Sequence, residues 1–299
     1  MLDNNQNIKT VISLGYFDSV HNGHRKVIST ARKYADEKNA KLVVFTFGGN
    51  LKAVLRGEDE KSVYMPNERE ILLKELGADE IYFAPVDFNF LSIGKLAFLN
   101  LLNRKYNICC YVSGTDYRFG KFGKGNVDDI KRFAGEKGQD VIIVDDVEYD
   151  DKKISTTRIK KLLESGDVKG ANVLLGKPYF ISGTVFEDRK IGHELGFPTV
   201  NINLTEDKFR LKDGVYQGRV NLDGKSYKTV INYGARPTFN LNEKLVEAHV
   251  IGFNGCLYGK EIILYVDAFI REIQKFKSRD ELMAQLAKDC LTAGENDYD

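Results

Sequence analysis

Short apolar runs alternate with helical patterns along the first half of the chain. Strands are predicted at 11–14, 41–47, 80–84, 108–112 and 140–144. Helices are predicted between them at 25–38, 66–76, 96–102 and 127–137. Strands that alternate with helices in this way favour a parallel sheet that is covered by helices on both faces.

Three polar, glycine-containing segments each follow one of these predicted strands, at 15–24, 48–50 and 113–125. In a parallel sheet the carboxyl ends of the strands share one edge, and ligands bind beyond that edge. We therefore expect the three segments to converge on one site.

The pattern changes in the second half of the chain. Helical patterns at 154–163 and 167–175 end at Gly176 and Pro178. Strands are then predicted at 179–186, 199–202, 215–222, 226–233, 246–251 and 261–269. Asp223-Gly224 is a hairpin signal, and Ser278 and Glu281 form a capping box before a last helix. These features predict a small closed antiparallel barrel with a terminal helix. We expect two domains, 1–178 and 179–299.

Composition narrows the classes of partner. The net charge is +1 although 29% of the residues are charged, and Lys and Arg are scattered. We therefore expect no nucleic-acid partner and no membrane partner. The first residues are polar and do not resemble a signal peptide, and the four cysteines form no Cys-x-x-Cys motif. Buried free thiols in a reducing cytoplasm are the simplest interpretation. We also expect a monomer or a weak homo-oligomer.

His21 and His24 follow the first predicted strand and precede the first predicted helix. Free backbone N–H groups and the positive end of the helix dipole attract phosphate at such a turn. Gly23 has no side chain to hold a ligand away, and imidazoles can donate hydrogen bonds to phosphate oxygens. An H-x-G-H element in this context is typical of nucleotidyltransferases. The alternative is two surface histidines in an ordinary turn.

Other polar residues of the first half have two possible roles. The 113–125 loop lacks the Walker A spacing, and it is either a mobile loop whose Tyr117 and Phe119 cover a flat ligand or a solvated loop. Ser155, Thr156 and Arg158 at a helix start suit the distal phosphates of a triphosphate, or they form an ordinary N-cap. Asp18 orients its loop, helps to hold a metal ion or is a plain turn residue.

The second half carries Gly192 and Gly196, which permit a close backbone approach to phosphate. Thr199 and Asn201 alternate along a strand, so they share a face on which they can hold a magnesium ion with its phosphates. The alternative is a Gly-Pro turn that opens a barrel strand. Glu247 lies in an apolar-alternating strand, where it is either a proton acceptor for a substrate hydroxyl or an exposed residue.

Together these residues resemble the bacterial bifunctional riboflavin kinase/FMN adenylyltransferase family, over nearly the whole chain. The N-terminal resemblance rests on 15–18, 21–24, 114–125 and 154–158, and the C-terminal resemblance on 174–176, 196–201, 214–216, 232–238, 246–247, 257–259 and 269–276. It implies a Rossmann-like nucleotidyltransferase domain with a parallel sheet, followed by a riboflavin kinase β-barrel with a C-terminal helix. It also implies Mg²⁺ with ATP, and riboflavin, FMN and FAD as substrates and products.

The resemblance also implies roles for the residues. In the barrel, Glu247 would be the general base, Thr199 and Asn201 would position Mg-ATP, and Gly192 and Gly196 would bind phosphate. In the first domain, the catalytic residues would be His21, His24 and Arg158, and ATP would be held by Gly15, Phe17, Asp18, Gly23, Ser155 and Thr156. Flavin contacts would come from Asp116, Tyr117, Phe119 and Arg271.

The chain departs from the family pattern at Ser19, Asp188 and His193, and at 48–50, where the family usually shows Pro-His-Pro. These departures leave three alternatives to the bifunctional enzyme. They are a nucleotidyltransferase for other cofactors, a paralogue that retains only one activity, and a non-catalytic flavin-nucleotide sensor.

Overall fold

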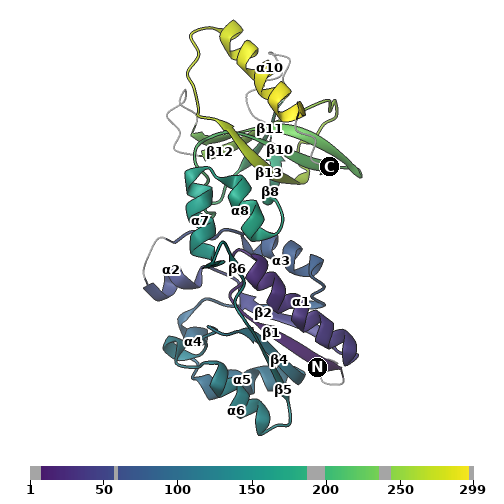
Figure 1. Cartoon of the computed structure of the whole chain (residues 1–299), viewed down its shortest axis with the longest axis vertical. Helices are drawn as coiled ribbons and strands as arrows, with labels where there is room; N and C mark the ends of the chain where they lie inside the picture. Colours follow the sequence, from purple (N-terminus) through teal and green to yellow (C-terminus); the bar gives the residue numbers. More distant parts are fainter. Residues whose placement is uncertain (1–7, 57–59, 187–198, 236–243, 296–299) are drawn as a thin grey trace. The chain divides into compact units, whose positions relative to one another are not determined.

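The computed structural model describes residues 8–56, 60–186, 199–235 and 244–295. The chain divides into two compact units, Met1–Thr156 and Thr157–Asp299 (Figure 1). The domain boundary that the sequence predicts after residue 178 stays a prediction.

The first unit contains a five-stranded parallel sheet with strand order β3-β2-β1-β4-β5. The strands are β1 Lys9–Leu14, β2 Lys41–Phe47, β3 Glu80–Ala84, β4 Asn107–Gly114 and β5 Asp140–Val144. The helices are α1 Asn22–Glu37, α2 Leu51–Arg56, α3 Pro66–Glu75, α4 Phe88–Leu91, α5 Lys95–Lys105 and α6 Val127–Gly135. A two-stranded hairpin follows, with β6 Glu148–Tyr149 and β7 Lys152–Lys153. The predicted parallel sheet is confirmed.

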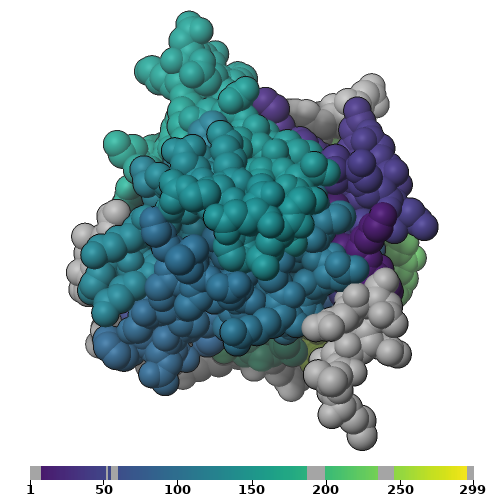
Figure 2. All heavy atoms as spheres, turned by 90° about the horizontal axis from the view of Figure 1, so that it is seen from below, coloured from purple at the N-terminus to yellow at the C-terminus, as the bar shows by residue number. Residues whose placement is uncertain are grey.

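Helices cover both faces of this sheet, as Figure 1 shows for α1 on one side and α5 and α6 on the other. Ile12 and Leu14 of β1 pack with Phe98 of α5 and Ile130 of α6 in one core cluster. The space-filling view shows blue atoms, which belong to the first unit, gathered on one face of the molecule (Figure 2). Burial on both faces explains why the strands are nearly continuous apolar runs.

The strand order determines where the loops meet. β1 lies in the middle of the sheet, and its last residue, Leu14, aligns with Phe45 of β2 and Ser113 of β4. After β1 the chain adds β2 and β3 on one side of it, and it then crosses to the other side to add β4 and β5. The strand order therefore reverses between β1 and β4, which is the topological switch point of the sheet. The segments that follow β1, β2 and β4 therefore leave the same edge of the sheet, as predicted.

The second unit contains a closed antiparallel barrel with strand order β10-β11-β12-β9-β8-β13, in which β13 also pairs with β10. Its strands are β8 Tyr179–Phe186, β9 Thr199–Asn203, β10 Gly214–Leu222, β11 Lys225–Ala235, β12 Lys244–Val250 and β13 Glu261–Arg271. Its helices are α7 Thr156–Ser165, which begins at the last residue of the first unit, α8 Val168–Leu175 and α10 Arg279–Glu295. The predicted barrel and terminal helix are confirmed.

Local chemistry explains several of these elements. Leu222 pairs with Lys225 across Asp223-Gly224, whose φ angles of 50° and 80° match a two-residue hairpin turn. The Ser278 Oγ accepts a hydrogen bond from the Glu281 N–H at 3.2 Å, so the capping side chain that begins α10 is confirmed.

Two sequence-based expectations about the whole chain have structural outcomes. All four cysteines lie in the described ranges as free thiols, but only Cys110 is buried. The expectation of buried thiols is therefore wrong for Cys256, which is exposed, and for Cys109 and Cys290, which are half-buried. Within the described ranges, no helix has both the length and the apolar character needed to cross a bilayer.

Candidate functional site

The imidazole rings of His21 and His24 stack on each other at the start of α1. Their centroids are 3.7 Å apart and their planes differ by 12°. His21 is the N-cap of the helix, and its Nδ1 accepts a hydrogen bond from the His24 N–H at 3.2 Å. Because Nδ1 is the acceptor, the proton of a neutral His21 is on Nε2, which is thus a donor. The sequence predicted this pair of imidazoles at the turn after β1, and the structure confirms their placement.

The backbone before His21 is strained. Phe17 and Val20 have φ angles of 48° and 42°, a region that costs a β-branched residue such as Val20 about 1–3 kcal/mol. The Phe17 ring is buried and lies edge-on to His24 at 5.3 Å. A Cβ atom on Gly15 would lie 2.4 Å from the Phe17 ring, so the glycine is what permits this turn. Gly23 lies close to His21, since an added Cβ would be 3.0 Å from its Cε1.

Both imidazoles are held in their neutral form. Burial lowers the pKa of His21 to about 4, and the positive charge of Lys153 contributes in the same direction. Burial also lowers the pKa of His24 well below its usual value, and His21 and Lys153 add to this effect. The Nδ1 of His24 is buried without a hydrogen-bond partner in the described part of the chain. The pair therefore offers neutral N–H donors rather than fixed cations.

Lys153 is a charged residue near this site that the sequence analysis missed. Its Nζ lies 2.8 Å from Asp116 Oδ2 and 2.9 Å from Asp146 Oδ2, so β7, the loop after β4 and the segment after β5 meet at one ammonium group. The electrostatic effects of these three residues all reach His21. Only the position of Lys153 immediately before Ile154-Ser155 could have indicated it.

The hydroxyl residues at the start of α7 reach the turn that carries His21. Thr156 Oγ1 and Ser19 Oγ are 2.9 Å apart, and Ser19 is fully buried. Ser155 immediately precedes the helix. Arg158 lies in the first turn of α7 and is partly buried, and it belongs to the second unit. The hydroxyls of Ser19 and Thr156 are thus brought together, whereas the role predicted for Arg158 stays a prediction.

The aromatic residues of the loop after β4 are divided between core and surface. Phe119 is 5% exposed and belongs to the core cluster, and Tyr117 stacks on it with a centroid separation of 5.8 Å. Phe122 of the same loop is 76% exposed and has a φ angle of 58°. The exposed aromatic face of this loop is therefore that of Phe122, and the flavin contacts predicted for Tyr117 and Phe119 stay predictions.

Two further predicted positions lie at the same edge of the sheet. Asp18 is 3% exposed, and its carbonyl accepts a hydrogen bond from the Tyr64 N–H at 3.3 Å. In the segment after β2, Asn50 Oδ1 accepts a hydrogen bond from the Ala53 N–H at 3.1 Å at the start of α2. Asn50 therefore has a structural use in this chain, at a segment where the family usually shows Pro-His-Pro.

In the barrel, Thr199 and Glu247 form the central contact. The Thr199 hydroxyl donates to Glu247 Oε1 at 2.7 Å. Asn201 is the cross-strand partner of Glu247, so Thr199, Asn201 and Glu247 share one face of the β9–β12 pair. Val246 and Ala248 point to the opposite, buried face. Gly192, Gly196, Asp188 and His193 lie outside the described residues.

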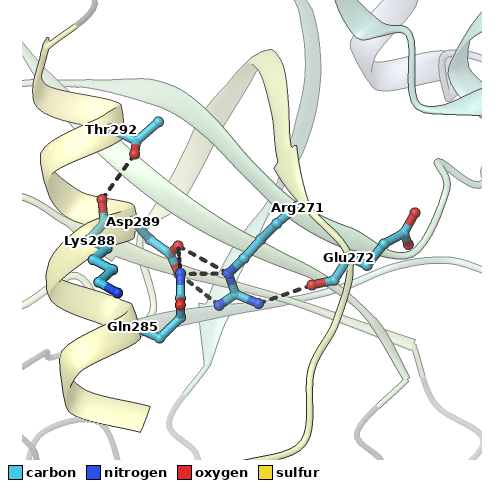
Figure 3. Close-up of polar contacts among 6 residues, drawn as sticks. All are labelled: Arg271, Glu272, Gln285, Lys288, Asp289 and Thr292. Atoms are coloured by element: carbon cyan, nitrogen blue, oxygen red, sulfur yellow. Dashed lines mark hydrogen bonds and ion pairs between the residues drawn. The ribbon is translucent and has the colours of Figure 1, made fainter. Parts of the chain in front are cut away.

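Arg271 is engaged by the terminal helix (Figure 3). Its Nη2 lies 2.7 Å from Asp289 Oδ2, its Nε donates to both oxygens of that carboxylate, and Asp289 is 1% exposed. Gln285 Nε2 also donates to Asp289, at 2.9 Å. The guanidinium thus joins β13 to α10, and the flavin contact predicted for it stays a prediction.

The described residues contain no group of three or more His, Cys, Asp and Glu side chains that could hold a metal ion. The oxygen atoms of Thr199 and Asn201 are hard donors on one strand face, and they fit Mg²⁺ that keeps most of its ligands from phosphate and water.

Comparisons with known proteins match one family model to the part of the chain with His21 and His24 and another to the part with Thr199 and Glu247. The FAD synthetase family model matches residues 3–158, and the riboflavin kinase family model matches residues 175–296. The bifunctional riboflavin kinase/FMN adenylyltransferase of Bacillus subtilis is 37% identical over 94% of this chain and 90% of that protein. The protein with the same description in Listeria monocytogenes is 32% identical, with coverages of 94% and 90%.

A solved structure is also similar to this chain over almost the full length of both proteins. The crystal structure of a macrolide-efflux protein from Streptococcus pneumoniae superimposes with a TM-score of 0.85 and 32% identity, covering 97% of this chain and 95% of that chain. Its likeness extends across both units. On the two family models and the identities to the curated relatives, this chain belongs to the bifunctional riboflavin kinase/FMN adenylyltransferase family.

Proposed function

We propose that this protein makes FAD from riboflavin in two ATP-dependent reactions. The first phosphorylates riboflavin to FMN, and the second adenylylates FMN to FAD with release of pyrophosphate. The observation that carries the proposal is the presence of two separate sites in one family member: the stacked His21–His24 pair in one unit and the Thr199–Glu247 contact in the other.

In the kinase reaction, Glu247 acts as the general base. Thr199 holds Oε1 of the carboxylate, which leaves Oε2 to accept the proton of the terminal ribityl hydroxyl. The oxygen of that hydroxyl attacks the γ-phosphorus of ATP, and ADP leaves. Thr199 and Asn201 position the triphosphate with its Mg²⁺, which supplies charge neutralisation on the phosphate oxygens.

In the adenylyl transfer, a phosphate oxygen of FMN attacks the α-phosphorus of a second ATP, and pyrophosphate leaves. No protein nucleophile is required, so catalysis consists of positioning and charge stabilisation. The Nε2–H of His21 and the N–H of His24 donate to the phosphate oxygens as negative charge develops. Ser155, Thr156 and Arg158 hold the outgoing phosphates, and the free N–H groups at the start of α1 add to the positive potential.

The remaining residues of the site have supporting roles in this proposal. Gly15, Phe17, Asp18 and Gly23 shape the phosphate-binding turn. Asp116 and the loop that carries Tyr117 and Phe119 face the flavin or the nucleotide, and Arg271 contributes to flavin binding in the barrel. A cytoplasmic location, the absence of a nucleic-acid partner and a monomeric or weakly oligomeric state stay predictions.

One assay tests the proposal. The purified chain is incubated with riboflavin, ATP and Mg²⁺, and the flavins are separated by chromatography. FMN and FAD together support two activities, FMN alone indicates loss of the adenylyl transfer, and bound flavin without either product indicates a sensor.

Two reciprocal variants assign the sites. Glu247→Gln removes the base, so FMN formation falls by about 10²- to 10⁴-fold while FAD formation from supplied FMN is retained. His24→Ala has the opposite pattern. Glu247→Gln with full kinase activity contradicts the role of Glu247.

A further inference from the structure

Arg69 is a buried guanidinium at the edge of the sheet from which the phosphate-binding turn leaves. It lies on α3, is 1% exposed and is among the largest fully buried side chains of the described chain. No sequence motif indicated it. A charged side chain this deeply buried has a high desolvation cost, so its contacts indicate what it is retained for.

The guanidinium binds the carboxyl ends of two neighbouring strands. Its Nη1 donates to the Tyr16 carbonyl at 3.2 Å and to Thr46 Oγ1 at 3.3 Å, and its Nη2 donates to the Phe47 carbonyl at 2.7 Å. The Thr46 hydroxyl donates in turn to the Tyr16 carbonyl at 2.6 Å. Tyr16 follows β1 and directly precedes the strained Phe17, so Arg69 fixes the point at which the chain enters the turn.

The charge of Arg69 is not neutralised by direct contact. Within the described residues it forms no ion pair, and its Nε is buried without a hydrogen-bond partner. Burial lowers its pKa, whereas the negative charge of Asp18 acts in the opposite direction. Asp18 lies between Phe17 and Ser19 in the same turn. The guanidinium therefore acts on the turn in two ways. It donates a hydrogen bond to the Tyr16 carbonyl, and it attracts the Asp18 carboxylate electrostatically.

We propose that Arg69 is a positioning residue of the adenylyl-transfer site, which holds the strained Phe17–Val20 turn and thereby the His21–His24 pair in the geometry that receives the triphosphate. This inference rests on the proposed function. Arg69 acts through Tyr16, Thr46 and Asp18 and does not itself contact the substrate. A positive φ angle at Val20 persists only when surrounding contacts over-determine it, and Arg69 supplies those contacts on the strand side.

Arg69→Lys keeps the positive charge and removes the fork that spans both strands. The matched control is Arg32→Lys. Arg32 of α1 also binds carbonyls, of Gly77 at 3.1 Å and Ala40 at 3.3 Å, but these lie at the opposite, amino-terminal edge of the sheet. Thr46→Val is a milder second variant that removes only the hydroxyl between Arg69 and Tyr16.

Kinetics give the first readout. Arg69→Lys is expected to lower kcat for FAD formation from FMN about 10- to 100-fold at saturating substrates, because small displacements of a reacting geometry have effects of this size. Thr46→Val lowers it by a smaller factor, Arg32→Lys leaves it within about twofold, and riboflavin phosphorylation is unchanged in all three. Equal effects of Arg69→Lys and Arg32→Lys, or a parallel loss of kinase activity, would overturn the proposal.

A second readout does not depend on activity. The chain has four histidines, so histidine-selective ¹⁵N labelling gives a small set of imidazole signals. Arg69→Lys should shift the signals of His21 and His24 and leave that of His249 in place, whereas Arg32→Lys should shift none. Unshifted His21 and His24 signals in Arg69→Lys overturn the inference even if FAD is made. If the wild-type chain makes no FAD but Arg69→Lys still shifts the His21 and His24 signals, only the proposed function is refuted.

Discussion

Ser19 Oγ lies 2.9 Å from Thr156 Oγ1, and this contact joins the turn after β1 to the start of α7. The two residues are 137 positions apart in the chain. Ser19 stands where the family usually has glycine, which has no hydroxyl to offer. In this chain the turn after β1 and the start of α7, which we propose to bind phosphate, are therefore joined by a side-chain hydrogen bond.

Loss of this hydrogen bond should loosen the site. Ser19→Ala removes the side-chain partner of the half-buried Thr156 hydroxyl, and loss of such a hydrogen bond costs about 1 kcal/mol. We expect FAD formation from FMN to fall about 3- to 30-fold with riboflavin phosphorylation unchanged. Ser29→Ala, which removes a hydroxyl from the exposed side of α1, is the control and should change neither rate. Equal rates for the two variants contradict this role of Ser19.

The buried histidines predict how stability depends on pH. Burial lowers the pKa of His21 from 6.5 to about 4 in the folded chain, so between these values the unfolded chain binds more protons than the folded chain. The free energy of unfolding therefore rises with pH through this window, and stability is lost as pH falls from 6.5 towards 4. The contribution of His21 is about 3 kcal/mol.

His21→Asn separates this titration from helix capping, because asparagine is also a good N-cap. Thermal unfolding measured between pH 4 and 7 should show a shallower slope for His21→Asn than for the wild type. Some slope should remain, because burial lowers the pKa of His24 in the same direction. Superimposable pH profiles would show that His21 is not neutral in the folded chain.

Lys153 should contribute to adenylyl transfer through its charge. Its ammonium lies between Asp116 and Asp146 beside the histidine pair, where it can attract the triphosphate. Lys153→Met should raise KM for ATP or lower kcat by about tenfold or more in FAD formation, with the kinase reaction unaffected. The neighbouring Lys152→Met is the control, since side chains of adjacent strand residues point to opposite sides. An equal response of the two lysine variants rules out a special role for Lys153.

The ion pair of Arg271 and Asp289 should stabilise the barrel unit. Removing one partner of a buried pair leaves an uncompensated charge, which costs about 3 kcal/mol or more. Asp289→Asn should therefore lower the thermal midpoint of unfolding and reduce riboflavin phosphorylation, while FAD formation from FMN continues. Glu272→Gln alters a more exposed pair, with Lys212, and should change the midpoint little. Unchanged stability in Asp289→Asn would indicate that Arg271 serves another contact.

Local pattern predicted most of the elements. The bounds of β2, β3, β5 and β8 coincide with apolar runs that the sequence shows directly. By contrast α2, α4 and the β6–β7 hairpin were not predicted, because these short segments carry too few residues to show a periodicity. The turn at Asp223-Gly224 was predictable because its two residue types favour positive φ angles.

The sequence by itself determined the two fold classes and the positions of His21, His24, Thr199 and Glu247 on them, because hydrophobic periodicity and motif spacing are local properties. Only the tertiary structure decided the long-range contacts. It placed Lys153 between two aspartates, buried Phe119 in the core with Tyr117 packed against it, paired Arg271 with α10 and buried Arg69 at the ends of β1 and β2. These contacts join side chains that are distant in the sequence, and such side chains meet only in the folded sheet and the folded barrel.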